Sequence, residues 1–520
     1  MVSEFDTFWE GIVQRGESPN LVAMSSNTCK SFVIGPGVPD VSGDPHWPGR
    51  ISQPTCWVND THSALNLTQV SRIIEPRTVD DVVRAVERAR AQGTSLAIAG
   101  GRHAMGGQQF LTARTLLDMR QLNRVCALDE EHGLLEVQAG TTWPHVMRGY
   151  LVRQNGRMSR WGIRQKQTGA DCLSIGGAVA ANIHGRCLTA PPFIADLESL
   201  EVVTADGDVV RCSRNEQPGL FRHAIGGYGL FGVVTAATLR LVPRRQVERV
   251  VEILDMDDLM DAMDQRIAAG CLYGDFQFAT DPDDSRFLRT GVLSCYRPTE
   301  KEKPIPPGQR RMSQSDWNRL LELAHRDKRR AFDEFAAFYL ATSGQLYWSD
   351  THQLNLYLED YHGALDGRLD STVRGSEMIT EVYVPRARLA AFMDDVRRDF
   401  LEHRVDFIYG TIRLIEPDTE SALPWARERY ACVIFNVHID HHPPMITEAR
   451  ATFVRLIDHA IAHGGSYYLT YHRFGRCDQL MTCHPGLLDF LSAKRHLDPL
   501  GVFQSDWYRH ILALTSGQLA

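Results

Sequence analysis

The stretch that decides the fold runs from residue 95 to residue 107 and reads Ser95-Leu96-Ala97-Ile98-Ala99-Gly100-Gly101-Arg102-His103-Ala104-Met105-Gly106-Gly107. Its small and apolar first half is typical of a buried strand, and the glycines that follow are typical of a tight turn. A helix with one apolar face precedes it, and we expect Thr78 to cap this helix and Gly93 to end it. A strand–helix–strand unit therefore leads into a glycine-rich turn.

Two further glycine-rich runs follow the first one. They read Ser174-Ile175-Gly176-Gly177-Ala178-Val179-Ala180-Ala181-Asn182-Ile183-His184-Gly185 and Gly226-Gly227-Tyr228-Gly229-Leu230-Phe231-Gly232-Val233-Val234. Glycine lets backbone N–H groups approach an anion closely, and a long dinucleotide needs several such approaches. The spacing differs from the Gly-x-Gly-x-x-Gly that opens a Rossmann helix, so a Rossmann fold is not favoured.

Composition narrows the class of protein. The 520 residues are 43% hydrophobic and carry a formal net charge of -8, which disfavours a nucleic-acid partner. The sequence has no apolar run of about 18 residues and no signal-peptide pattern at its start, so we expect no membrane span and a cytoplasmic location. The 11 cysteines are scattered without CxxC spacing, which indicates neither a disulfide scaffold nor a zinc site built on cysteine pairs.

The glycine-rich runs resemble those of flavoproteins in the vanillyl-alcohol-oxidase and p-cresol-methylhydroxylase superfamily. The Gly-Gly-Arg-His turn is similar to the pyrophosphate loop of that family. The run from Ser174 to Gly185 is most similar to decaprenylphosphoryl-ribose oxidase and to sugar-lactone and alditol oxidases. The stretch Lys494-Arg495-His496-Leu497-Asp498-Pro499-Leu500-Gly501-Val502-Phe503 resembles their C-terminal signature.

The resemblance implies an α+β fold in two parts. Residues 1–243, with a core at about 66–243, are expected to form the main part of an FAD-binding domain, to which residues 466–520 return. Residues 244–465 are expected to form a substrate cap with an antiparallel sheet flanked by helices. A helix is predicted near 315–340 and a strand at 379–384, whereas residues 1–55 are expected to be irregular.

FAD is the implied cofactor, and His103 is expected to bond covalently to the flavin. The alternative is a histidine that only donates a hydrogen bond to the pyrophosphate. Arg102 stands where the family usually has glycine. Cys172 could provide a second covalent link, or it could pack as a small buried side chain. The other residues expected to hold FAD are Gly100, Gly101, Arg102, Ala104, Met105, Gly106, Gln108, Gly169, Ser174, Gly176, Gly177, Ala180, Ile183, Gly185, Gly232 and Val233.

Four residues are candidates for catalysis. His184 matches a histidine that lies near the flavin in relatives, although a satisfied backbone donor is the alternative. Arg413 matches an arginine at flavin N1 and C2=O, but Gly410-Thr411 replaces the glutamate that accompanies it. His472 is the expected base, because its ordinary pKa suits proton transfer at neutral pH, and Tyr471 is the second choice.

No metal is expected. The run His438-Ile439-Asp440-His441-His442 offers metal-binding side chains, but it stands at the end of a strand before Pro443-Pro444 and is interpreted as a solvated loop.

The implied activity is that of an FAD-dependent oxidase that takes a hydride from a CH–OH or similar CH–X group and passes electrons to O2. Three alternatives stay open: an oxidative decarboxylase or desaturase of secondary metabolism, a non-redox flavoprotein of the alkyl-glycerone-phosphate synthase kind, and a flavin-binding module without catalysis. A small molecule is the expected substrate, and the protein is expected to be a monomer or a homodimer.

Overall fold

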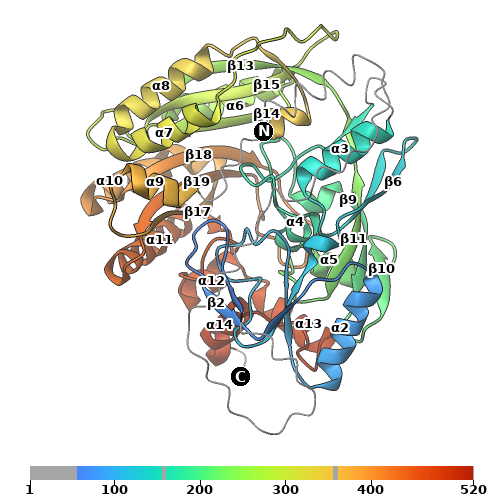
Figure 1. Ribbon diagram of the computed structural model, residues 1–520. Coiled ribbons are helices and arrows are strands. Elements are labelled where there is room, and N and C mark those ends of the chain that lie inside the picture. The colour runs from blue at the N-terminus through green and yellow to red at the C-terminus, as the bar shows by residue number, and fades with distance from the viewer. Residues whose placement is uncertain (1–55, 155–159, 355–360, 519–520) are drawn as a thin grey trace.

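The computed structural model describes residues 56–154, 160–354 and 361–518. The predicted irregular segment at residues 1–55 lies outside the described residues. The described chain folds into two halves, seen in Figure 1 as a blue-to-green half with the red C-terminal helices and a yellow-to-orange half.

The first half contains the predicted strand–helix–strand unit. A parallel sheet of three strands has the order β3 (Arg72–Ile74), β5 (Thr115–Asp118), β4 (Leu96–Ala99), and helix α2 (Val79–Ala91) connects β3 to β4. The expected N-cap of α2 is present: the Thr78 hydroxyl accepts the Asp81 N–H, and the Asp81 carboxylate accepts the Thr78 N–H. Gly93 follows the helix with φ of +57°, a backbone conformation that favours glycine.

A second sheet packs beside the first. It is antiparallel, with the order β10 (Val209–Ser213), β9 (Leu197–Val203), β11 (Val233–Arg240), β7 (Leu134–Gln138), β6 (Val125–Asp129). Helices α3 (Trp143–Arg153), α4 (Ile175–Ala181) and α5 (Pro218–Ala224) cover it, and the core between them includes Trp143, Phe193 and Phe221. Two short strand pairs complete this half: β1 (Cys56–Val58) with β2 (Thr68–Val70), and β8 (Trp161–Gly162) with β12 (Val242–Pro243).

The second half is built on one large sheet of eight strands, in which every neighbouring pair is antiparallel. This confirms the predicted α+β class with an antiparallel cap. The strand order is β16 (Leu346–Trp348), β13 (Gln246–Asp255), β15 (Thr290–Pro298), β14 (Tyr273–Phe278), β18 (Phe407–Ile415), β19 (Tyr430–Asp440), β17 (Gly375–Pro385), β20 (Ser466–Tyr467).

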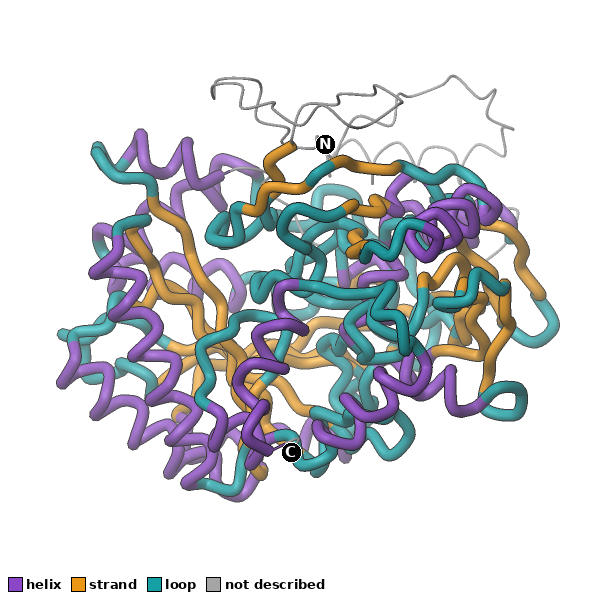
Figure 2. The backbone as a smooth tube through the Cα atoms, turned by 90° about the horizontal axis from the view of Figure 1, so that it is seen from below, coloured by secondary structure: helices purple, strands orange, loops and turns teal. Residues whose placement is uncertain are grey.

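Helices pack on both faces of this sheet, and neighbouring residues of β15 show the division. Leu293 belongs to the core under α6 (Leu259–Ala268), α10 (Leu389–His403) and α11 (Pro443–Ala462), whereas Val292 packs against α8 (Lys328–Leu340) on the opposite face. Figure 2 shows helices of this half along the outside of its strands.

The helix predicted near 315–340 is in fact two helices, α7 (Gln314–Arg326) and α8. They are separated at Asp327, whose side chain caps α8 by accepting the Arg330 N–H. A further helix, α9 (Tyr361–Arg368), contacts both α7 and β17.

The C-terminal segment crosses back to the first half. It contains α12 (Cys477–Cys483), α13 (Leu487–Leu497) and α14 (Asp506–Thr515). Phe503 pairs with Leu96 of β4, and the Ser95 hydroxyl donates to the Gly501 carbonyl at 2.7 Å. The tail therefore lies directly beside the strand that leads into the first glycine-rich turn.

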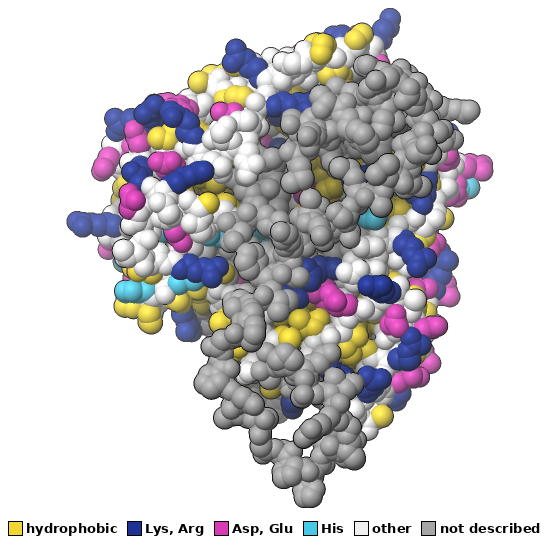
Figure 3. All heavy atoms as spheres, viewed as in Figure 1, with side chains coloured by type: hydrophobic (Ala, Val, Ile, Leu, Met, Phe, Trp, Pro, Cys, Tyr) yellow, Lys and Arg dark blue, Asp and Glu magenta, His cyan; other side chains and the backbone are white. Residues whose placement is uncertain are grey.

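The surface carries charges of both signs. Basic and acidic side chains are mixed over the described part of the face shown in Figure 3. Among the described helices, none is long and apolar enough to cross a membrane.

Candidate functional site

One cavity brings the three glycine-rich runs together. Its walls come from the segments 98–109, 167–183, 224–234 and 468–471, and Ile379 of the cap sheet closes one side. Segments from the start, the middle and the end of the chain therefore meet around one space, with the cap above it.

The glycines let segments of the cavity wall pack unusually close to one another. A Cβ on Gly100 would lie 2.0 Å from the Ser174 hydroxyl oxygen, and one on Gly101 would lie 2.5 Å from the Cys172 carbonyl oxygen. Gly232 has φ of +140°, which side chains rarely allow. Glycines that line a cavity leave backbone N–H groups close to it, and such groups suit the pyrophosphate of a dinucleotide.

His103 lines this cavity and is almost fully buried. Its Nδ1 lies 2.8 Å from Nε2 of His62, and its ring also hydrogen-bonds to the Cys172 backbone. Burial and the neighbouring His62 hold the pKa of His103 well below its ordinary value, so the ring is neutral at neutral pH. These two contacts hold the neutral imidazole in place in the cavity wall.

Arg102 stands where the family usually has glycine, and it adopts a backbone conformation typical of glycine. Its φ of +59° is the left-handed conformation that glycine adopts freely. The side chain turns back to Asp118, with 2.8 Å between Nη2 and Oδ2, and both side chains are buried. The ion pair holds the turn in a conformation that costs a non-glycine residue about 1 kcal/mol or more.

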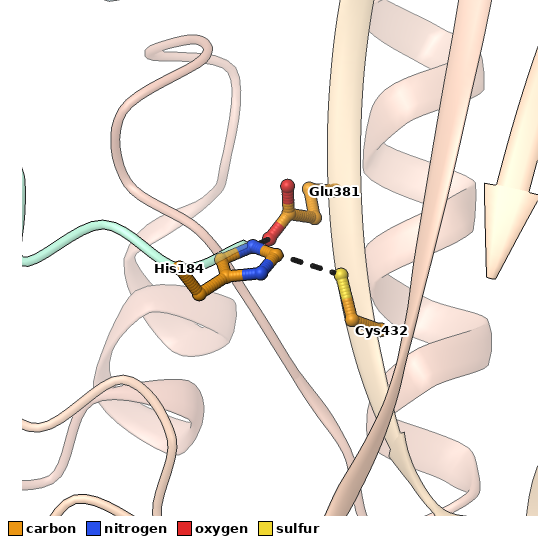
Figure 4. A group of neighbouring side chains, drawn as sticks. All are labelled: His184, Glu381 and Cys432. Atoms are coloured by element: carbon orange, nitrogen blue, oxygen red, sulfur yellow. Dashed lines mark hydrogen bonds and ion pairs between the residues drawn. The ribbon is translucent and has the colours of Figure 1, made fainter. Parts of the chain in front are cut away.

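Behind the cavity, a buried carboxylate joins the two halves (Figure 4). Glu381 of β17 has its Oε1 2.6 Å from Nε2 of His184, which comes from the second glycine-rich run. Tyr383 donates its hydroxyl to the same oxygen at 2.5 Å. Burial alone would raise the pKa of Glu381, but the neighbouring His184 and these hydrogen bonds bring it below its ordinary value.

Cys432 completes the group drawn in Figure 4, with its Sγ 3.9 Å from Nε2 of His184. Burial raises the pKa of this thiol well above its ordinary value. His184 therefore contacts both Glu381 and Cys432, and these three side chains form a hydrogen-bonded group.

Tyr471 connects this buried group to the cavity. It lines the cavity, and its hydroxyl donates to Oε2 of Glu381 at 3.2 Å. Burial and the nearby Glu381 raise the pKa of Tyr471 well above its ordinary value, so the phenol keeps its proton. The Gln167 amide also approaches this hydroxyl, at 3.4 Å.

Arg413 lies on the face of the cap sheet that carries Glu381. It is 4% exposed, and its Nε and Nη1 have no hydrogen-bond partner among the described residues. Lys166 is a second buried cation, paired with Asp171 at 2.5 Å. Two buried positive charges near one cavity suit a ligand that gains negative charge.

The glutamate missing beside Arg413 has a counterpart two strands away. Thr411 of β18 pairs with Ile434 of β19, and Ile434 pairs with Glu381 of β17. Sequence reasoning missed Glu381, although it was visible as the charged residue within the predicted strand at 379–384. The Glu381 carboxylate therefore lies in register with Thr411, the position of the missing glutamate, but on another strand.

The structure separates the four expected catalytic residues. Tyr471 lines the cavity, whereas His184 and Arg413 lie behind its wall. His472, the expected base, points away: its Nε2 lies 2.9 Å from the Thr380 hydroxyl, on the sheet face opposite Glu381, and its ring packs on Phe453. Burial lowers the pKa of His472 to about 3, which makes it a weak base.

Most residues expected to hold FAD line the cavity, namely Gly100, Gly101, Arg102, His103, Ala104, Gln108, Gly169, Ser174, Gly176, Gly177, Ala180, Ile183 and Gly232. Five do not line it in the described chain: Met105, Gly106, Cys172, Gly185 and Val233. The Met105 and Gly106 N–H groups donate to the Thr470 carbonyl and thereby attach the turn to the C-terminal segment. His62, Tyr468 and Thr470 line the cavity and were not expected.

Comparison with known proteins identifies the first half. Residues 70–213 match the family described as FAD binding domain. An uncharacterized oxidoreductase of the fasciation locus in Rhodococcoides fascians is 31% identical over 201 residues, which are 38% of this chain and 44% of that protein. Cytokinin dehydrogenase 4 of Oryza sativa subsp. japonica is 27% identical over 257 residues, 47% of this chain and 46% of that protein.

D-Arabinono-1,4-lactone oxidase of Debaryomyces hansenii is 25% identical over 267 residues, 48% of this chain and 44% of that protein. The chain spans less than half the length of each of these three relatives. Residues 70–213 thus form an FAD-binding domain of the p-cresol-methylhydroxylase type, and through it the chain is a distant homologue of cytokinin dehydrogenases and D-arabinono-1,4-lactone oxidase in the vanillyl-alcohol-oxidase superfamily.

Proposed function

We propose that the protein is an FAD-dependent oxidase that acts on a CH–OH group of a small molecule. The observation that carries this proposal is that Tyr471 lines the cavity while its hydroxyl is hydrogen-bonded to the buried pair of Glu381 and His184. Relatives named dehydrogenase, oxidase and oxidoreductase favour redox chemistry over a non-redox reaction.

Bound FAD would supply the hydride acceptor, with O2 as the final electron acceptor. The residues of this chain would hold the other product of the oxidation, the hydroxyl proton. Tyr471 would accept that proton while its own passes to Oε2 of Glu381, 3.2 Å away. His184 supports the receiving carboxylate from its other oxygen.

Arg413 would stabilise negative charge on the reduced ring. Its Nε and Nη1 are buried without a hydrogen-bond partner in the described chain, and such donors are costly unless a ligand accepts from them. The resemblance places the corresponding arginine at flavin N1 and C2=O, and Lys166 adds a second buried cation.

His103 would form the covalent bond to the flavin. It lines the cavity, and burial keeps its imidazole neutral, as nucleophilic attack requires. Cys172 does not line the cavity in the described chain, so the geometry gives no support to a second link.

The experiment measures flavin reduction directly. Purified protein with bound FAD is mixed under nitrogen with a panel of sugar lactones, polyols and other alcohols, and the flavin absorbance is followed. A substrate should bleach the flavin, and admission of air should restore the colour and give hydrogen peroxide. Tyr471→Phe and Glu381→Gln should each slow bleaching by about 10²-fold or more.

Tyr508→Phe is the matched control, because it removes a hydroxyl from α14 in the C-terminal segment, at a residue that does not line the cavity, and should leave the rate unchanged. If Tyr471→Phe bleaches the flavin at the unaltered rate and His472→Asn bleaches it more slowly, His472 is the base instead of Tyr471. Release of carbon dioxide during bleaching would favour the decarboxylase alternative, and a flavin that no member of the panel bleaches would count against the proposed substrate class.

A further inference from the structure

A second cluster of ligand-type side chains lies away from the flavin cavity, on the same face of the cap sheet. Glu377 of β17 and His438 of β19 are register partners. Glu377 precedes Glu381 by four residues, about 13 Å along the strand. His325 of α7 and His362 of α9 reach the same carboxylate from above the sheet.

The distances are those of atoms that surround one ion. Nε2 of His325 lies 3.2 Å and Nδ1 of His438 lies 3.5 Å from Oε1 of Glu377, and all three atoms lie within 4.8 Å of one another. Ligands about 2.0–2.1 Å from a tetrahedral ion are about 3.3–3.4 Å apart. The two contacts with Glu377 bracket that spacing.

None of these three atoms has a hydrogen-bond partner among the described residues. The side chains of His325, Glu377 and His438 are only 7%, 1% and 16% exposed. Buried nitrogen and oxygen atoms left without partners cost about 1–3 kcal/mol each. The three atoms are close enough to one another to share one cation.

The groups around the cluster orient the ligands. Tyr361 donates its hydroxyl to Oε2 of Glu377 at 2.5 Å, and Nδ1 of His362 lies 2.9 Å from the same oxygen. Nε2 of His438, the ring nitrogen that faces away from Glu377, lies 3.4 Å from Asp440. A carboxylate next to the outer nitrogen of a ligand histidine is a common support in metal sites.

We propose that His325, Glu377 and His438 bind a divalent transition-metal ion, zinc being the best match. Two imidazoles and one carboxylate suit zinc, whereas magnesium and calcium prefer oxygen ligands alone. A water molecule would take the fourth position. The ion would tie α7 to strands β17 and β19. His438 would then be a metal ligand on β19, and not part of the solvated loop predicted for residues 438–442.

The test uses the full chain with FAD bound. Protein stripped with a chelator and dialysed is titrated with Zn²⁺ by calorimetry, and metal content is measured after gel filtration. One Zn²⁺ per chain is expected. His325→Asn combined with His438→Asn should weaken Zn²⁺ binding by about 100-fold or more, because two of three ligands are lost. His132→Asn, an exposed histidine that contacts Asp129, is the matched control and should bind as the unaltered protein does.

X-ray absorption at the zinc edge provides a second measurement that does not depend on the folding of a variant. It should show histidine ligands at about 2.0–2.1 Å. Folded, FAD-bound protein that takes up no Zn²⁺ would overturn the proposal. So would a double variant that keeps the full zinc content, or an absorption spectrum without histidine scattering.

Discussion

We expect the covalent attachment of the cofactor to depend on His103. We expect acid-precipitated protein to stay yellow and its denatured mass to include FAD, because the neutral His103 ring lines the cavity. His103→Ala should release FAD on acid precipitation and oxidise substrate more slowly, because a covalent link raises the flavin potential in this family.

Cys172→Ala is the companion variant and should keep the covalent flavin. Yellow precipitate from His103→Ala would instead assign a link to Cys172. Complete release of FAD from the unaltered protein would contradict both covalent assignments. Acid precipitation with mass spectrometry distinguishes these outcomes.

Asp196 should make the protein less stable as the pH rises from 4 to 7. Its carboxyl is buried, with Arg164 Nε at 3.2 Å and Gln165 Nε2 at 2.8 Å. Burial outweighs these two contacts and raises the pKa of Asp196 to about 6. Between about pH 4 and pH 6 the folded state therefore keeps a proton that the unfolded state has lost. This contribution to stability is present below pH 4 and is lost as the pH rises through 6, by about 3 kcal/mol.

Asp196→Asn mimics the protonated carboxyl and should remove this loss. Measured by urea unfolding, the variant should gain stability relative to the unaltered protein as the pH rises from 4 to 7. Asp208→Asn, an exposed position on the same half, should show a difference that does not change with pH. A pH-independent difference for Asp196→Asn would contradict the assignment.

At the scale of elements, the turn after α13 shows how the C-terminal segment is held beside β4. Asp498 pairs with Lys494, and its two carboxylate oxygens accept the N–H groups of Val502 and Phe503, each at 2.9 Å. Phe503 then pairs with Leu96. One buried carboxylate therefore sets the direction in which the chain returns to the FAD-binding half.

Asp498→Ala should destabilise the protein by about 3–5 kcal/mol, because it leaves the buried Lys494 charge and two N–H groups without a partner. Thermal or urea unfolding measures the change, and weaker FAD retention should accompany it. Asp489→Ala, an exposed aspartate on α13, is the control with a small expected effect. Equal losses in the two variants would contradict a special role for Asp498.

At the scale of the whole molecule, a buried hydrogen-bonded pair, Tyr150 with Asp350, joins the two halves. Asp350 of the cap half accepts the Tyr150 hydroxyl of α3 at 2.6 Å, and Nε of Arg244 lies 2.8 Å from the same carboxylate. Asp350 is fully buried. Together with the contact between His184 and Glu381, this pair ties the cap to the FAD-binding half at two separate points.

Asp350→Ala should leave Arg244 as a buried charge without a partner, at a cost of about 3–5 kcal/mol. Because the carboxylate links the halves, calorimetry should show the single unfolding transition broaden or split into two. Asp370→Ala, whose side chain is 91% exposed, should leave the transition unchanged. A uniform shift of one sharp transition in Asp350→Ala would argue that the halves do not separate at this contact.

The amino-acid sequence by itself determined the local features of the protein. The Thr78 cap, the apolar strand before Gly100 and the three glycine-rich runs all follow from short-range patterns, because capping, periodicity and turn conformation depend on nearby residues. The resemblance carried by those runs predicted the FAD-binding fold and the antiparallel cap. The break between α7 and α8 at Asp327 was missed, because the Leu, Ala and Arg residues on both sides of it all favour a helix.

Only the tertiary structure decided which side chains meet. Tyr471 and His472 are adjacent in sequence, yet one faces the cavity and the other packs on Thr380 at the opposite face of the sheet. A shift of one residue reverses such an assignment, so a sequence pattern cannot make it. Glu381 and His184, like His325 and His438 of the proposed metal site, come from separate elements. Their convergence depends on strand register and on the packing of distant segments, which no local pattern encodes.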